Sequence, residues 1–332
     1  MSFLSPEILL MIAERADMST ISAMTQTSKA TCGLIMEYQG SVVKHKLATS
    51  SILFPPSGAI LSSATYTERK ILEPHTFYIT QELERRQFRI NALLEDEASV
   101  LLNLIIKDDK ACGFLPERET QNLIAGFKHA AMILDRLGDS CVDGLCAVKS
   151  TEDDALVRRQ SHLAQLDLIL HRLTSRELAF LSTFVDFCVQ TYAKLHPYAQ
   201  EDPAPWVRLT SFREALMRNG TLIIWAWLEN ALAPASGIVT TSPTPTELTE
   251  KIIEDTLVEI EEWEEGPRAE DERDFHESHL KLPSLYTSVR DAFAKHTGRN
   301  VKRAWNDMEV EVLVAIKEDN FNVSTTTKAA ET

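Results

Sequence analysis

Hydrophobic residues recur at helical spacing along most of the chain. After Pro116 they follow at steps of three or four residues, in the series Leu123, Phe127, Ala130, Leu134 and Leu137. Such spacing places the apolar side chains on one face of an α-helix. Gly138 follows directly, at a position where helices commonly end. The pattern predicts an all-α fold.

A second long helical stretch contains a break in its middle. Thr174-Ser175-Arg176-Glu177 forms a capping box, a pattern that starts a helix. The apolar series before it is Leu156, Leu163, Leu166, Leu170 and Leu173, and the series after it is Leu178, Leu181, Val185, Cys188, Tyr192 and Leu195. We therefore predict an antiparallel helix pair. The alternative is one continuous helix from 155 to 195, about 60 Å long.

Three later stretches add to the predicted helical body. The run from Leu222 to Leu228 is apolar all round, so we expect it in the central core. Ser284 to Lys295 is predicted to form a helix, with Leu285, Val289, Ala292 and Phe293 at helical spacing. The run from Met308 to Ile316 is ambiguous, because its alternation favours a strand whereas its helical surroundings favour a helix. We predict a helix there.

Segments rich in Ser, Thr, Pro and Gly divide the chain. Residues 48–67 and 233–246 are predicted linkers. The apolar residues Ile52, Leu53, Phe54 and Ile60 leave open that the first is a loop packed on the body. The predicted order is a helical module over 1–47, a helical body over 68–232, an acidic C-terminal helical region over 247–319 and a disordered polar tail over 320–332.

The first residues carry strong helix signals. Ser5-Pro6-Glu7 is a helix start, with a capping hydroxyl, a proline at the first position and an early acid. The apolar run from Ile8 to Ile12 covers the whole helix circumference, so this helix must be covered on more than one side. Asp17-Met18-Ser19 and Thr27-Ser28-Lys29 are predicted to cap two further short helices. Three short helices need support from the rest of the chain or from a partner.

This stretch resembles the F-box, over residues 1–47. The matching residues are Leu4, Pro6, Glu7, Ile8, Leu9, Ile12, Met18, Ile21, Met24, Ser28, Lys29 and Leu34. The resemblance implies a three-helix F-box-like module in front of an irregular multi-helix body. It also implies a non-catalytic substrate receptor of a Skp–cullin–F-box ubiquitin ligase, which recruits an unknown target protein through its body.

The resemblance further implies which residues bind the Skp adaptor, and through it a cullin-RING ligase. They are Leu4, Pro6, Glu7, Ile8, Leu9, Ile12, Met18, Ile21 and Met24. The alternative is a helical scaffold or protein-binding protein unrelated to ubiquitin ligases, whose first helices are an ordinary buried hairpin. The two interpretations differ in whether the first helix leaves apolar side chains exposed.

Charge narrows the possible partners. The chain has 49 acidic and 34 basic side chains, a net charge of −15, and such a chain repels phosphate backbones, so we expect no nucleic-acid partner. Most of this charge lies between Glu247 and Glu277, which holds fourteen acids and three bases. We expect an amphipathic helix over 247–264 whose acidic face is solvated, the alternative being an acidic surface that docks a basic segment.

No familiar catalytic motif occurs. GxxxxGK, GxGxxG and GxSxG are all absent. Cys141 and Cys146 have a spacing seen in zinc sites but lack a second pair nearby, and His276 and His279 do not form HExxH. We therefore expect no catalytic residue, no metal and no cofactor.

The start of the chain does not resemble a secretory signal, and no apolar run approaches the ~20 residues of a membrane helix. The five cysteines are odd in number and scattered, as expected for reduced thiols. We therefore predict a cytoplasmic or nuclear protein without a membrane partner.

Overall fold

The computed structural model describes residues 4–49, 60–61, 71–95, 115–140, 154–195, 205–232, 251–253, 283–319 and 321. Helices dominate these residues, and the strands among them are β1 (Ile60–Leu61) and β2 (Ile71–Leu72), which pair antiparallel. The predicted all-α fold is confirmed. The chain forms two compact units, Met1–Arg89 and Ile90–Thr332. No helix in the described part of the chain is long and apolar enough to cross a membrane.

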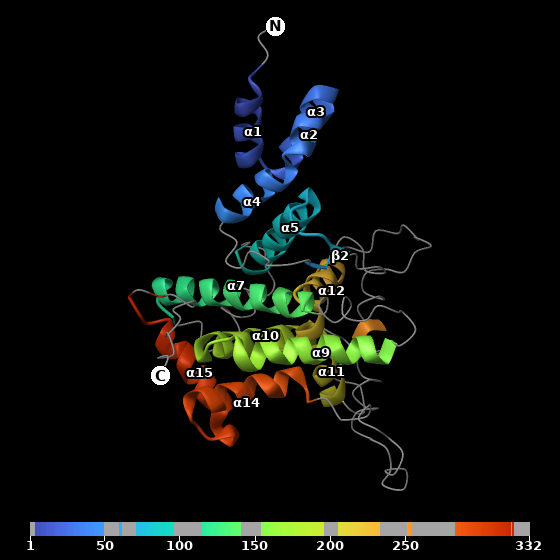
Figure 1. Ribbon diagram of the computed structural model, residues 1–332. Helices are drawn as coiled ribbons and strands as arrows, with labels where there is room; N and C mark the ends of the chain where they lie inside the picture. The colour runs from blue at the N-terminus through green and yellow to red at the C-terminus, as the bar shows by residue number, and fades with distance from the viewer. Residues whose placement is uncertain are drawn as a thin grey trace, which may run out of the picture. The chain divides into compact units, whose positions relative to one another are not determined.

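The first unit begins with four short helices (Figure 1). They are α1 (Pro6–Arg15), α2 (Met18–Thr27), α3 (Lys29–Glu37) and α4 (Gln39–Thr49). Asp17 caps α2 by accepting a hydrogen bond from the backbone N–H of Thr20 at 2.7 Å, and Ser28 caps α3 through Thr31 at 3.1 Å. These two predicted caps are confirmed. Ser5 precedes α1 as its N-cap residue but makes no side-chain cap bond.

Two apolar clusters hold the first unit together. Ala13, Ile21, Ile35 and Val42 form one, so that each of the four short helices contributes a residue. The other contains Val43 of α4, Ile60 of β1, and Ile79 and Leu83 of α5 (Phe77–Leu94). Arg86 of α5 also donates to the backbone carbonyl of Leu61 at 2.7 Å.

The predicted boundaries of this region need correction. The unit extends to Arg89, and Ile60 and Leu61, inside the predicted 48–67 linker, are 1% and 5% exposed. The reason is that α4 carries a second apolar side chain, Val43, which needs its own cover. Sequence reasoning treated α4 as the end of a module, whereas it joins two clusters.

The second unit is built around a long buried helix, α10 (Ser175–Leu195), which packs against α7 (Glu117–Asp139), α11 (Pro205–Asn219), α14 (Leu285–Thr297) and α15 (Ala304–Ala315). The described part of this unit also contains α9 (Asp154–His171), α12 (Leu222–Leu232) and the 3-10 turn η1 (Val301–Arg303). Tyr192 of α10 stacks on Phe212 of α11, with ring centroids 4.1 Å apart.

The predicted apolar faces of α7 and α10 are confirmed. Leu123, Phe127, Ala130, Leu134 and Leu137 are buried, as are Leu178, Leu181, Val185, Cys188 and Tyr192. The side chain of Leu195, the last residue of the second series, lies outside the described part of the chain. The capping box is also present, because Thr174 N–H donates to Glu177 Oε2 at 2.7 Å and Glu177 N–H to Thr174 Oγ1 at 3.2 Å. A break between α9 and α10 excludes the single continuous helix.

The buried face of α9 agrees with the predicted one only in part, because Leu166 and Leu173 are buried and Leu170 is half-buried. Leu163 is 41% exposed, whereas His162 and Gln165 are buried. Gln165 Nε2 donates to the carbonyls of Leu137 and Arg218 at 3.0 and 3.2 Å, and His162 Nε2 donates to the carbonyl of Pro283 at 2.9 Å. Helix α9 makes its most extensive contacts with α14, so it is not primarily paired with α10.

Gly138 does not end its helix as predicted, because α7 continues to Asp139. A Cβ at Gly138 would lie 3.3 Å from the backbone of Asn219, so the glycine permits close approach of α11. The nearby Gly220, between α11 and α12, has a positive φ of 76°, a conformation that glycine adopts readily.

The C-terminal segments are described in part. The run from Met308 to Ile316 belongs to α15 and its C-cap, so the predicted helix is confirmed. Phe321, in the predicted disordered tail, packs edge-on against Phe180 with centroids 5.7 Å apart, which corrects that prediction at this residue. The rest of the tail, the 233–246 linker and nearly all of the acidic 247–264 stretch lie outside the described residues.

Two glycines within helices are expected to respond to alanine in opposite ways. A Cβ at Gly126 in α7 would lie 2.1 Å from Phe180, a fully buried ring, so Gly126→Ala should lower the free energy of unfolding by ~1–3 kcal/mol. A Cβ at Gly33 in α3 would meet nothing within 4 Å, and Gly33→Ala should raise it by ~0.5–1 kcal/mol. Urea unfolding followed by circular dichroism measures both. A neutral Gly126→Ala would contradict the packing.

Stability should fall in acid partly because of His162. Burial lowers its pKa from 6.5 to about 4, and the charge of Arg218 acts in the same direction, although the bond to Pro283 opposes them. Between pH 4 and pH 6.5, His162 is protonated in the unfolded chain but stays neutral in the folded chain. The contribution of His162 to the free energy of unfolding is therefore fully present above about pH 6.5 and is lost as the pH falls toward 4.

The test compares melting temperatures at pH 7 and pH 4.5. The melting temperature of His162→Gln should fall less between pH 7 and pH 4.5 than that of the unmodified chain. His171→Gln, at an exposed histidine of the same helix, should behave like the unmodified chain. An unchanged pH dependence in His162→Gln would refute the assignment.

Candidate functional site

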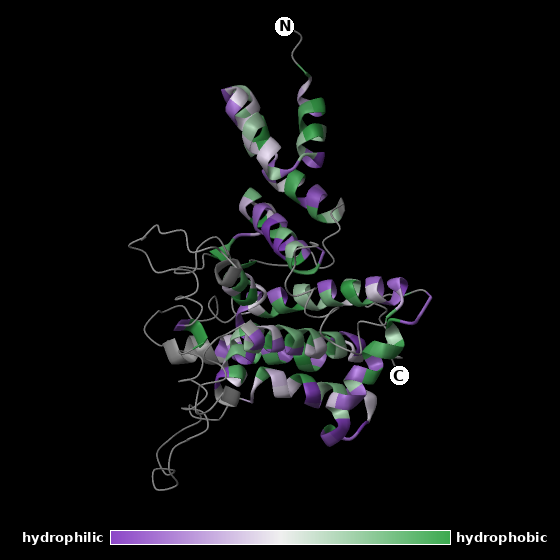
Figure 2. Cartoon of the chain, turned by 180° about the vertical axis from the view of Figure 1, so that it is seen from behind, coloured by the Kyte–Doolittle hydropathy of each residue, from purple (hydrophilic) through white to green (hydrophobic). Residues whose placement is uncertain are grey.

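Helix α1 leaves one apolar face in solvent. Leu4, Ile8, Met11 and Ile12 are 53%, 45%, 51% and 39% exposed. In α1 the last three follow helical spacing, so with Leu4 just ahead of the helix they form one stripe, which we call the α1 stripe. Figure 2 shows the hydrophobic colouring along this helix. On the opposite face, Ala13 is fully buried.

The nine predicted adaptor-binding residues fall into three groups. Leu4, Pro6, Glu7, Ile8 and Ile12 are exposed. Leu9, Met18 and Met24 are half-buried, and the two methionines pack against the first apolar cluster. Ile21 is 1% exposed inside that cluster, so in this structure it holds the helices together and is not on the surface.

The predicted adaptor-binding residues do not include Met11, although it belongs to the apolar run from Ile8 to Ile12. Met11 lies three positions after Ile8 and is as exposed as its neighbours. The F-box pattern does not fix a residue at this position, whereas helical spacing would have included it. Met36 and Tyr38, at the end of α3, are also exposed large apolar residues of the first unit.

Polar contacts fix the turn after α1. The hydrogen bonds that Asp17 accepts from the hydroxyl and backbone of Thr20 lower the pKa of Asp17 to about 2. Lys46 of α4 donates to the carbonyl of Ala16, and the backbone N–H of Met18 donates to Glu84 of α5 at 3.4 Å. The stripe is therefore presented by a helix whose C-terminal end is tied to two other elements.

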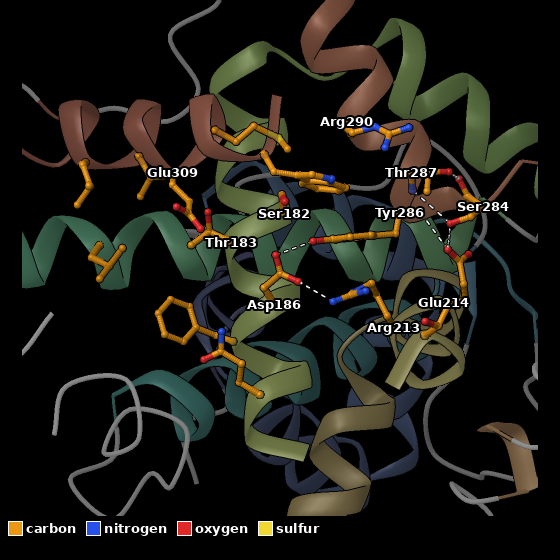
Figure 3. A pocket seen from close by; sticks show the side chains of 18 of the residues that line it. Ser182, Thr183, Asp186, Arg213, Glu214, Ser284, Tyr286, Thr287, Arg290 and Glu309 are labelled. Atoms are coloured by element: carbon orange, nitrogen blue, oxygen red, sulfur yellow. Dashed lines mark hydrogen bonds and ion pairs between the residues drawn. The ribbon is translucent and has the colours of Figure 1, made fainter. Parts of the chain in front are cut away.

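The second unit contains a cavity of about 630 Å³ bounded by α7, α10, α11, α14 and α15 (Figure 3). One end is mainly apolar, lined by residues of α7, α10, α15 and the ends of these helices. They are Leu115, Leu123, Phe187, Met308, Val312, Leu313 and Ile316. This volume lies within the range of roughly 300–1,000 Å³ that is usual for ligand pockets, which are mostly apolar with a few placed polar groups.

The other end is polar and centres on Asp186 of α10. Arg213 Nη2 donates to Asp186 Oδ1 at 3.0 Å, and the hydroxyl of Tyr286 donates to Asp186 Oδ2 at 2.5 Å. Figure 3 shows Arg213 and Tyr286 reaching Asp186 from different helices. Burial and the nearby Asp186 charge raise the pKa of Tyr286, so the phenol stays protonated and donates.

Aromatic stacking gives this end a rigid wall. The Tyr286 ring stacks on Trp305 of α15 with centroids 4.6 Å apart and an angle of 16° between the planes. The guanidinium carbon of Arg213 lies 4.3 Å from the centroid of Tyr286, and that of Arg290 lies 5.9 Å from the centroid of Trp305. Cation–π contacts of this kind orient guanidinium groups.

Glu214 ties the wall to the start of α14. Its carboxylate accepts from the backbone N–H groups of Leu285 and Tyr286 at 3.1 and 3.2 Å, and from the hydroxyl of Ser284. A carboxylate satisfies the free N–H groups of a helix N-terminus well. Glu214 therefore has a structural role, although it also lines the cavity.

The structure does not test the prediction that the cysteine and histidine pairs bind no metal. Cys141, Cys146, His276 and His279 lie outside the described residues. Within the described part of the chain, no group of three or more His, Cys, Asp and Glu side chains is arranged to hold a metal ion.

His129 and Glu177 form a buried pair at 3.0 Å that joins α7 to the start of α10.

No family model matches the chain, and neither a curated protein nor a solved structure matches it. The two features that bear on function are the α1 stripe in the first unit and the cavity in the second.

Proposed function

We propose that the protein is a non-catalytic substrate receptor of a Skp–cullin–F-box ubiquitin ligase. The observation that carries this proposal is the α1 stripe, which coincides with the part of the sequence that resembles an F-box. In this proposal the stripe binds the Skp adaptor, and the adaptor connects the chain to a cullin-RING ligase.

The energetics of the stripe support a binding role. Single exposed apolar residues are ordinary, but four neighbouring large ones on one face are typical of an interaction site. Burying a large aliphatic side chain completely contributes roughly 1.5–3 kcal/mol, and these four have about half of their surface left to bury. The stripe therefore has enough apolar surface for the centre of an interface.

The alternative of a helical scaffold predicts a different first helix. If α1 were only a core element, its apolar residues would be covered by the chain itself. The exposure of Leu4, Ile8, Met11 and Ile12 favours the docking interpretation instead.

The target is expected to bind elsewhere in the chain, because the stripe is committed to the adaptor. A receptor of this kind performs no chemistry and acts by raising the concentration of the target near the ligase. The acidic stretch over 247–264 remains a candidate surface for a basic target segment, but it lies almost wholly outside the described residues.

Acidic substitutions in the stripe should prevent adaptor binding. Ile8→Glu combined with Ile12→Glu changes two side chains that are already exposed, and glutamate is a good helix former, so the fold should persist. An unpaired buried charge costs several kcal/mol, so we expect affinity for a purified Skp adaptor to fall by ~100-fold or more. Calorimetry with the full chain and the adaptor measures the effect.

The matched control places the same charges on other exposed apolar residues of the first unit. Tyr78 and Phe88 of α5 are 68% and 66% exposed, and Tyr78→Glu with Phe88→Glu should leave adaptor binding unchanged. Failure of the unmodified chain to bind the adaptor would end the proposal. Equal losses in both double variants would show that charge alone, and not the stripe, determines binding.

A further inference from the structure

The acids that line the cavity of the second unit are either engaged by the protein itself or exposed to solvent. Asp186 accepts hydrogen bonds from Arg213 at 3.0 Å and from Tyr286 at 2.5 Å. Glu214 is 1% exposed and accepts from backbone N–H groups at the start of α14. Glu309 is exposed, so water hydrates its charge. The carboxylates of the lining are therefore satisfied without a cationic ligand.

The two arginines of the lining do not converge on one point. Figure 3 shows Arg213 and Arg290 on opposite sides of Tyr286. The guanidinium carbon of Arg213 lies over the Tyr286 ring, and that of Arg290 lies over Trp305, which stacks on Tyr286. Arg290 also donates to Asp291 at 3.0 Å. Each guanidinium therefore has a ring and a carboxylate of its own, and the pair does not form a site for an anion.

The rest of the lining is uncharged. Leu123, Met308, Val312 and Ile316 are buried apolar residues at one end of the cavity. Hydroxyl and amide groups complete the lining, and they belong to Ser182, Thr183, Gln190, Thr210 and Thr287. Removing apolar walls from water is favourable, and hydroxyl and amide groups form hydrogen bonds with an uncharged oxygen. The lining therefore favours an occupant that is mainly apolar and carries no charge.

We propose that this cavity binds an uncharged, mainly apolar small molecule that carries an alcohol or carbonyl oxygen. The apolar part lies against Leu123, Phe187 and Met308, and the oxygen lies among the hydroxyl groups of the polar end. The volume of about 630 Å³ suits a small molecule, and such sites are common between the helices of a bundle. This binding goes beyond the receptor function proposed above and does not depend on it, because the cavity and the α1 stripe belong to different units.

The experiment compares three ligands that share one eight-carbon chain. Octanol is uncharged, octanoate is negative and octylamine is positive at pH 7.5. Calorimetry with the full chain and no adaptor measures their affinities. We expect octanol to bind about tenfold or more tightly than either ion, because a charge in the cavity loses water without gaining an unengaged counter-charge. Equal or tighter binding of either ion, or no binding of octanol, overturns the proposal.

Matched variants locate the binding. Leu313 lines the cavity and is 46% exposed, whereas its neighbour Val314 is 55% exposed and does not line it. Leu313→Glu should weaken octanol binding about tenfold or more, and Val314→Glu should leave it unchanged. Ile8→Glu with Ile12→Glu should also leave it unchanged, because it alters only the α1 stripe. Circular dichroism checks that each variant is folded. Equal affinity of the Leu313 and Val314 variants, or loss of binding in the stripe variant, overturns the proposal.

The pairing of charges in the lining has its own test. Asp186→Asn removes the carboxylate that neutralises Arg213, so the affinity of octanoate relative to octanol should rise about tenfold. Asp167→Asn, at an exposed acid of α9 that pairs with Arg172 at 3.2 Å, should leave the ratio unchanged. An unchanged ratio in Asp186→Asn would show that the paired charges do not set the preference for an uncharged ligand, and it would overturn the proposal.

Discussion

The buried helix ends of the second unit impose the constraint on which its structure depends. A helix leaves four N–H and four C=O groups without partners at its termini, and burying them unsatisfied is costly. Here the partners come from other helices. Asp135 of α7 accepts hydrogen bonds from the N–H and hydroxyl of Thr221 at the start of α12. Glu214 of α11 accepts a hydrogen bond from the first N–H of α14. Gln165 of α9 donates to carbonyls near the ends of α7 and α11. Polar side chains thereby fix which helices meet.

This constraint explains which parts of the fold could be predicted from the sequence. Caps that act within a few residues were found, namely Asp17, Ser28 and the Thr174–Glu177 box. The apolar faces of α7 and α10 were found because large apolar residues recur along both helices at helical spacing. The face of α9 was predicted only in part, since Leu166 and Leu173 are buried but Leu163 is exposed. His162 and Gln165 of this helix bind carbonyls far away in sequence. Local patterns cannot reveal partners that only the fold brings near.

The same distinction applies to the sites. The α1 stripe was largely predictable, because a run of apolar residues around a whole helix must leave some of them uncovered unless a second layer exists. Which side stays open was decided by Ala13, a small residue that lets α1 approach Ile21, Ile35 and Val42 closely. The cavity was not predictable. Asp186, Arg213 and Tyr286 lie on three helices, and nothing in their sequence spacing connects them.

Glu214 connects the constraint on helix ends with the capacity of the cavity to bind a ligand. By holding the first turn of α14, it positions Tyr286, and Tyr286 in turn positions Asp186, Trp305 and Arg213 through one hydrogen bond and two ring contacts. The polar wall is thus set by the same contact that closes a helix end, so it exists before any ligand arrives. Binding to a preformed wall avoids most of the cost of ordering side chains. The polar wall of the cavity is therefore a consequence of satisfying a buried helix end.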